Sequence, residues 1–94
     1  MLQRTHVAGK EGTALVLYTL STCGWCKKTK ALLAELGLAY DYVDVDLLGP
    51  DEAAEAIEQV MKWNPSCSFP TIVVGDRDGI IGYQEEKIRS LAQP

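Results

Sequence analysis

Two cysteines separated by two residues are the part of this sequence whose types and spacing point most directly to chemistry. The segment reads Cys23-Gly24-Trp25-Cys26, and it follows a short apolar run and precedes a segment with helical periodicity. Both thiols can therefore lie on the first turn of a helix, where unpaired N–H groups and the positive end of the helix dipole favour the thiolate of Cys23. Because a thiolate is the attacking species in disulfide exchange, we expect Cys23 to attack a disulfide and Cys26 to resolve the mixed disulfide.

Metal binding is the alternative interpretation of the same spacing, because a Cys-x-x-Cys motif is also half of many zinc sites. A structural zinc site needs about four ligands. Cys67 and His6 are the remaining candidates, and His6 falls in a polar stretch with no second Cys-x-x-Cys motif to complete the set. The position of the motif between a strand and a helix favours redox chemistry. We therefore expect no metal site and no tightly bound cofactor.

The composition is that of one small globular domain. Its 94 residues are 47% hydrophobic and 23% charged, which allows one modest core and leaves no room for a second domain. The net charge is −4, and a nucleic-acid partner is not expected, because neutralising phosphates needs clustered Lys and Arg. The longest apolar run, residues 14–20, is far shorter than the ~20 residues that cross a membrane. No secretory signal is visible, so we expect a cytoplasmic monomer.

Hydrophobic periodicity predicts the elements that must position the cysteines. Residues 1–12 are expected to be a polar leader that pairs with little, and residues 13–94 to form the domain. Strands are predicted at residues 14–18, 39–45, 71–74 and 80–81. Helices are predicted from the turn at Ser21-Thr22 to Gly37, from Gly49-Pro50 to Asn64-Pro65, and over residues 84–91. The predicted order is βαβαββα, with Ile57, Val60, Met61 and Trp63 of the second helix in the core.

Two segments resemble the active site of the glutaredoxin family, within the thioredoxin-like superfamily. Residues 18–26, which contain the Cys-x-x-Cys motif, resemble the redox-active segment, and Ser68-Phe69-Pro70-Thr71 resembles the cis-proline loop. The resemblance covers about residues 14–91. It implies an α/β thioredoxin-like fold with a four-stranded mixed sheet and helices on both faces. It also implies a cis Pro70 that sets the main chain of Phe69 beside Cys23, where an incoming peptide or thiol can pair with it.

The same resemblance implies a function and a set of site residues. It predicts a thiol-disulfide oxidoreductase that reduces protein or glutathione mixed disulfides, with Cys23 and Cys26 as the catalytic pair. Glutathione is the candidate co-substrate, and disulfide-containing proteins are the expected partners. The residues expected to bind substrate lie near the cysteines in such a fold: Trp25, Phe69, Pro70, Gly82 and Tyr83.

The sequence departs from the family pattern at two positions that bear on the electron donor. Glutaredoxins usually have a lysine three residues before the first cysteine, which helps hold the glutathione carboxylate, and this chain has Leu20 there. They also usually have a Gly-Gly pair followed by an acidic residue before the last helix, where this chain has Gly82-Tyr83-Gln84. A glycine followed by an aromatic residue is closer to the redoxins that serve ribonucleotide reductase. Glutathione and thioredoxin reductase therefore both stay open as the reductant.

Three further residues leave alternatives open. Gly24 occupies a position where dithiol glutaredoxins commonly have proline and the monothiol, iron–sulfur-carrying members have glycine. A [2Fe–2S] cluster bridged by Cys23 of two chains is therefore the alternative function. Trp25 is either an exposed docking residue or packs onto the neighbouring helix. Cys67 is expected to be a small half-buried residue, and the expected disulfide is Cys23–Cys26.

Overall fold

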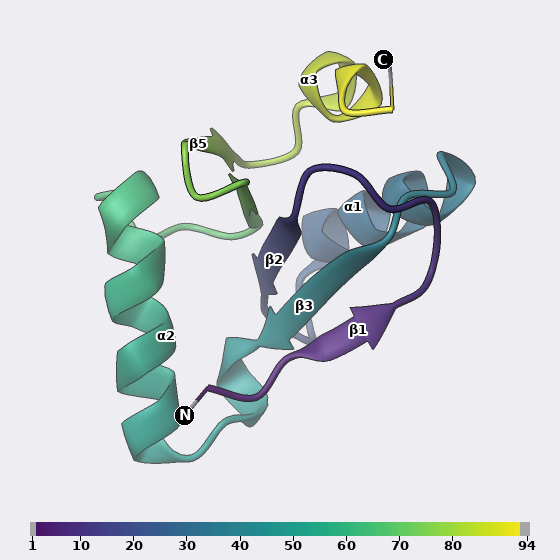
Figure 1. Cartoon of the computed structure of the whole chain (residues 1–94). Helices are drawn as coiled ribbons and strands as arrows, with labels where there is room; N and C mark the ends of the chain where they lie inside the picture. Colours follow the sequence, from purple (N-terminus) through teal and green to yellow (C-terminus); the bar gives the residue numbers. More distant parts are fainter. Residues whose placement is uncertain (1, 93–94) are drawn as a thin grey trace.

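Strand β2 (Leu15–Thr19) is the centre of the sheet, and all but one of its five side chains are buried. It pairs in parallel with β3 (Tyr40–Asp44) and antiparallel with β4 (Thr71–Val74). The structure, a computed structural model, describes residues 2–92; Met1 of the predicted leader and Gln93 and Pro94 of the predicted domain lie outside the described residues. Over residues 2–92 the strand order is β1-β3-β2-β4-β5, with β5 at Asp78–Ile81 and β1 at Thr5–Val7 (Figure 1).

Helices cover both faces of this mixed sheet, as the family resemblance implies. Helices α1 (Gly24–Glu35) and α3 (Glu85–Ser90) lie on one side, and α2 (Pro50–Trp63) lies on the other (Figure 1). Each side has its own core: Leu17, Leu33 and Ile88 belong to the first, and Val43 and Val60 belong to the second. From β2 onward the order is the predicted βαβαββα, with a short 3₁₀ helix, η1 (Val45–Leu47), added after β3.

The first residues pair with the sheet, which corrects the sequence prediction of a leader that pairs with little. Thr5–Val7 form the edge strand β1 and pair antiparallel with β3, so the described residues form five strands where the prediction had four. The strand is polar, and it is held by backbone bonds and by His6 and Arg4, which lie 2.7 and 3.5 Å from the carboxylate of Asp41. An edge strand needs little apolar surface, so hydrophobic periodicity did not detect it.

Helix α2 is rotated relative to the predicted orientation. Its buried residues are Ala56 and Val60, whereas Ile57 is 38% exposed and Met61 is 49% exposed. The predictions that Ile57 and Met61 are in the core are therefore wrong, the prediction for Val60 is confirmed, and Trp63 is half-buried at the edge of the second core. A small side chain at position 56 lets the helix approach the sheet closely, and this contact decides which face points inward.

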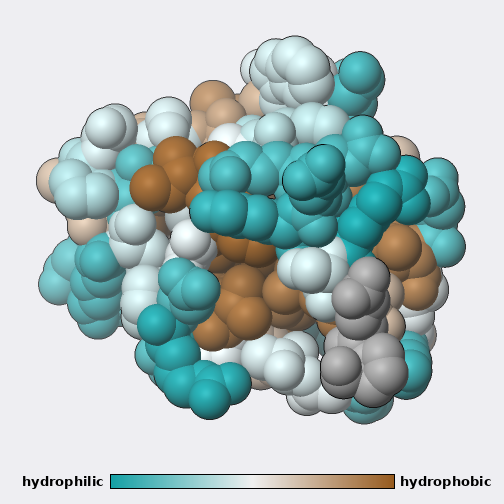
Figure 2. All heavy atoms as spheres, turned by 90° about the horizontal axis from the view of Figure 1, so that it is seen from above, coloured by the Kyte–Doolittle hydropathy of each residue, from teal (hydrophilic) through white to brown (hydrophobic). Residues whose placement is uncertain are grey.

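Apolar side chains also show at the surface. Seen from above, one group of them lies at the bottom of a central hollow with hydrophilic residues along its rim, and other groups lie at the outer surface (Figure 2). Among the helices of residues 2–92, none combines the length and the apolar character that crossing a membrane requires.

Two glycines of the segment between β1 and β2 give a matched test of how closely this segment packs against Leu38. A Cβ atom on Gly9 would lie 2.6 Å from the carbonyl carbon of Leu38, whereas a Cβ on Gly12 would meet nothing within 4 Å. We expect Gly9→Ala to lower the free energy of unfolding by about 1–3 kcal/mol through overpacking. We expect Gly12→Ala to leave it unchanged or raise it by about 0.5 kcal/mol. Urea denaturation measures both, and equal losses would contradict the close packing of Gly9 against Leu38.

Candidate active site

The loop between β2 and α1 is held by a carboxylate that lies 25 residues further along the chain. Asp46 of η1 accepts a 2.8 Å hydrogen bond from the Ser21 N–H and a second from the Ser21 hydroxyl. These bonds, the hydroxyl bond first, lower the pKa of Asp46, so it stays ionised. The N–H of Cys23 then closes a turn onto the Leu20 carbonyl at 3.1 Å. The sequence analysis did not identify Asp46, because nothing local relates it to Ser21.

The two cysteines of the motif lie in opposite environments on one helical turn. Cys23 is the N-cap of α1, and its half-exposed Sγ accepts a hydrogen bond from the Cys26 N–H at 3.2 Å. Cys26 is 1% exposed. Burial and then a hydrogen bond to Cys23 raise the pKa of Cys26 to about 12, although a hydrogen bond with the Leu20 backbone and, more weakly, the positive charge of Lys30 oppose the shift. Cys23 is thus the accessible sulfur, and Cys26 is the protonated thiol behind it.

All five residues predicted to bind substrate line one shallow pocket. Its volume is about 160 Å³, and its lining consists of Trp25, Phe69, Pro70, Gly82 and Tyr83. The Phe69–Pro70 peptide bond is cis, which confirms the prediction for Pro70. The Gly82 N–H donates to the Pro70 carbonyl at 2.8 Å, and Gly82 has φ of +76°, a conformation that favours glycine. The contact joins the segment after β5 to the loop before β4.

Trp25 is an exposed wall of this pocket. Its side chain is 57% exposed and stacks on Tyr83, with ring centroids 5.4 Å apart and an interplanar angle of 30°. The ammonium group of Lys28 lies 4.9 Å from the centroid of the Trp25 ring. Of the two interpretations of this residue, packing onto the neighbouring helix does not describe it, because its aromatic partner comes from the segment between β5 and α3.

A charged pair fixes α1 to the end of β3. Lys30 lies 3.1 Å from the carboxylate of Asp44, and its ammonium group is 4.1 Å from the centroid of the Tyr42 ring. The buried hydroxyl of Thr19 donates to the same carboxylate. Because Lys30 lies one turn after Cys26, this contact holds the helix at the depth that buries the Cys26 sulfur.

The third cysteine and the histidine come from other segments of the chain than the Cys-x-x-Cys motif. Cys67 is half-buried, has φ of +51° and packs against the second core as a free thiol. The Cys23–Cys26 disulfide stays a prediction, since all three cysteines are free in this structure. His6 is exposed on β1. Across residues 2–92, no three His, Cys, Asp or Glu side chains gather in an arrangement that could hold a metal ion.

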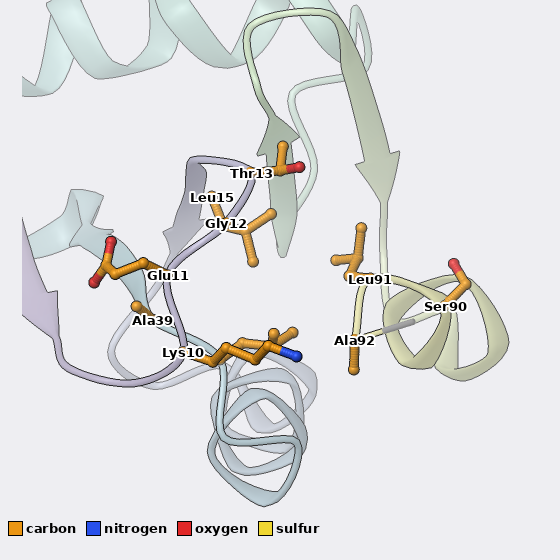
Figure 3. Close-up of a pocket in the computed structure, with 10 residues that line it drawn as sticks. Lys10, Glu11, Gly12, Thr13, Leu15, Ala39, Ser90, Leu91 and Ala92 are labelled. Atoms are coloured by element: carbon orange, nitrogen blue, oxygen red, sulfur yellow. The ribbon is translucent and has the colours of Figure 1, made fainter. Parts of the chain in front are cut away.

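A second, larger pocket lies at the other end of β2, where that strand begins. Its volume is about 440 Å³, and Figure 3 shows Lys10–Thr13 on one side and Ser90–Ala92 on the other. Cysteine is absent from its lining. The lining of the pocket at Trp25 holds no cysteine either, but Trp25 lies between Cys23 and Cys26 in the chain, so this pocket adjoins the motif.

The sheet order, the cis-proline loop and the capping cysteine together define a thioredoxin-like redox protein. The family model described as glutaredoxin matches residues 15–78, so the chain belongs to the glutaredoxin family. The glutaredoxin from Methanosarcina mazei Go1 is 46% identical, with a TM-score of 0.90, covering 97% of this chain and 88% of that one. Methanoredoxin from Methanosarcina acetivorans is 44% identical, with a TM-score of 0.83, covering 89% and 97%. The gene 56 protein of Mycobacterium phage D29 is 34% identical, covering 84% of this chain and 82% of that protein.

The opposite environments of the two cysteines predict selective alkylation. Because burial raises the pKa of Cys26 to about 12, its thiol is protonated at pH 8. We expect iodoacetamide at that pH to modify Cys23 and leave Cys26 unmodified until the protein is unfolded in urea. Peptide mass mapping after a short reaction measures the two sites. Equal modification of both cysteines in the folded protein would contradict the assignment of Cys26 as the buried thiol.

Proposed function

We propose that the protein is a dithiol disulfide oxidoreductase in which Cys23 attacks and Cys26 resolves. The observation that carries the proposal is the half-exposed Cys23 Sγ at the N-cap of α1, with the protonated Cys26 buried beside it. The Cys26 N–H donates to the Cys23 Sγ at 3.2 Å, so the sulfur is held at the start of the helix while it stays half-exposed to an incoming substrate.

The reaction transfers two electrons to the substrate. The Cys23 thiolate attacks one sulfur of a substrate disulfide, forms a mixed disulfide and releases the first substrate thiolate, which takes up a proton. Cys26 then loses its proton, attacks the sulfur of Cys23, and releases the second substrate thiolate as the Cys23–Cys26 disulfide forms. The substrate leaves as two thiols, and an external thiol reductant returns the protein to the dithiol state.

Protein disulfides fit the surface beside the cysteines better than glutathione does. The pocket walls supplied by Trp25, Phe69 and Tyr83 are aromatic and match an apolar side chain flanking a substrate disulfide. Leu20 occupies the position of the usual glutathione-binding lysine, and it packs against the second core as a half-buried side chain. We propose glutathione as a weak co-substrate and thioredoxin reductase as the rival electron donor.

An iron–sulfur function is the second candidate, and one observation favours it. A side chain at Gly24 would meet nothing within 4 Å, so the space beside the half-exposed Cys23 is open. A cluster bridging two chains would take one Cys23 from each chain, and two external thiols would supply the remaining two of its four thiolate ligands. This alternative stays a prediction, and it assigns no role to the buried thiol of Cys26.

The electron donor is tested by comparing two coupled assays on the same protein mixed disulfide. We expect turnover with thioredoxin reductase and NADPH to exceed turnover with glutathione and its reductase. Leu20→Lys should then raise kcat/KM for glutathione about two- to fivefold, the effect of an exposed ion pair. The variant should leave the thioredoxin reductase assay unchanged, and Leu20→Met controls for the altered packing.

Glutathione turnover that already exceeds thioredoxin reductase turnover in the unmodified protein would contradict the donor assignment. A protein that reduces no disulfide with either donor would contradict the oxidoreductase function itself.

A further inference from the structure

The side chain of Asn64 connects the end of α2 to the loop that precedes β4. It is 1% exposed, and its Nδ2 lies 2.9 Å from the Ser68 hydroxyl, 3.1 Å from the Ser68 carbonyl oxygen and 3.1 Å from the Thr71 hydroxyl. Its Oδ1 accepts from the Ser66 N–H at 3.2 Å. Its main-chain carbonyl accepts from the Cys67 N–H at 2.9 Å. One residue therefore holds the loop through both its side chain and its main chain.

The network ends on a fully buried residue of the sheet. Thr71 is 0% exposed, and its hydroxyl donates to the Ser68 carbonyl at 2.8 Å. Thr71 pairs with Tyr18 of β2 and with Ile81 of β5. The loop is therefore fixed at Ser68 and Thr71 relative to the central strand, which leads into the cysteines.

Phe69 and Pro70 lie between these two fixed points, and both line the pocket beside Trp25. Neither residue is held by a side-chain hydrogen bond of its own, because both side chains are apolar. Their position against Trp25 depends on the hydrogen bond from the Gly82 N–H to the Pro70 carbonyl and on the groups on either side. The Asn64 amide contacts both of these flanking residues, Ser68 and Thr71.

The end of α2 does not require the buried hydrogen bonds that the Asn64 side chain makes. Asn64 follows the last residue of α2, and its N–H donates to the Val60 carbonyl at 2.8 Å. An exposed polar residue would serve at a helix end with water as its partner. Burying a primary amide is costly unless its hydrogen bonds are made inside the protein, and the Asn64 amide makes all of its bonds to this loop and to Thr71.

We propose that Asn64 is a positioning residue for the disulfide exchange reaction. It fixes the main chain of Phe69 and Pro70 against Trp25, and so sets how tightly the polypeptide around a substrate disulfide binds beside Cys23. The residue touches no substrate, and the inference rests on the proposed oxidoreductase function. Its expected signature is a change in KM for peptide disulfides with little change in the reactivity of the Cys23 sulfur.

Two variants and one control test this role. Asn64→Ala removes the amide, and Thr71→Val removes one partner while keeping a branched side chain suited to a strand. Leu38→Ala is the control, because Leu38 is buried in the first core at the end of the sheet where β2 and β3 begin. It lowers stability without touching the loop. Steady-state kinetics with a fluorogenic peptide disulfide give kcat and KM, and the iodoacetamide reaction rate reports Cys23 alone.

We expect Asn64→Ala to raise KM about tenfold or more and Thr71→Val to raise it about threefold, since small misplacements of a binding surface have large effects. The alkylation rate of Cys23 should stay within about twofold of the unmodified protein in both variants, and Leu38→Ala should leave KM unchanged. If Asn64→Ala does not fold, Thr71→Val carries the test.

If Asn64→Ala and Thr71→Val have the same KM as Leu38→Ala, the positioning role is wrong. The proposed function would still hold in that case, provided that the unmodified protein reduces the peptide disulfide. Failure of the unmodified protein to reduce the peptide at all would instead overturn the proposed function, and the inference with it.

Discussion

The site depends on the cap at the start of α1, where the sulfur of Cys23 accepts the hydrogen bond that a serine or aspartate oxygen would accept in an ordinary helix. This contact fixes the Cys23 sulfur at the helix N-terminus and places Cys26 on the inner side of the same turn. The 1% exposure of Cys26 follows from that geometry. One turn of helix thereby places two chemically equal thiols in unequal environments. In the proposed mechanism the outer sulfur attacks the substrate, and the inner thiol stays protonated until the second step.

Contacts from distant parts of the chain hold this turn in place. Asp46 binds the loop before it through Ser21, and the Lys30–Asp44 pair binds the helix after it. The hydrogen bond from the Gly82 N–H to the Pro70 carbonyl joins the segment after β5 to the loop before β4, and both segments line the pocket. Exposed ion pairs are worth little singly. These contacts matter because each fixes an element whose position sets the distance between the thiols and the substrate surface.

The sequence correctly predicted the features that depend on a local residue pattern or on a motif shared with the family. The start of α1 follows from the motif between a strand and a helix, and the cis Pro70 follows from the resemblance of its loop. Strand β1 was missed because a polar edge strand has no apolar period, and Met61 was misplaced because packing at Ala56 sets the rotation of α2. Asn64 was read only as a helix end, since its partners become neighbours only after the loop folds.

The most direct test of this account is to trap the intermediate that the two sulfurs are proposed to share. Cys26→Ser protein, mixed with a chromogenic aromatic disulfide and mapped by mass spectrometry, should release one equivalent of aromatic thiol rapidly and keep the other half bound to Cys23. The unmodified protein should release both equivalents and end as the Cys23–Cys26 disulfide. A stable adduct on Cys67, or an adduct that persists equally in the unmodified protein, would contradict the division of roles between Cys23 and Cys26.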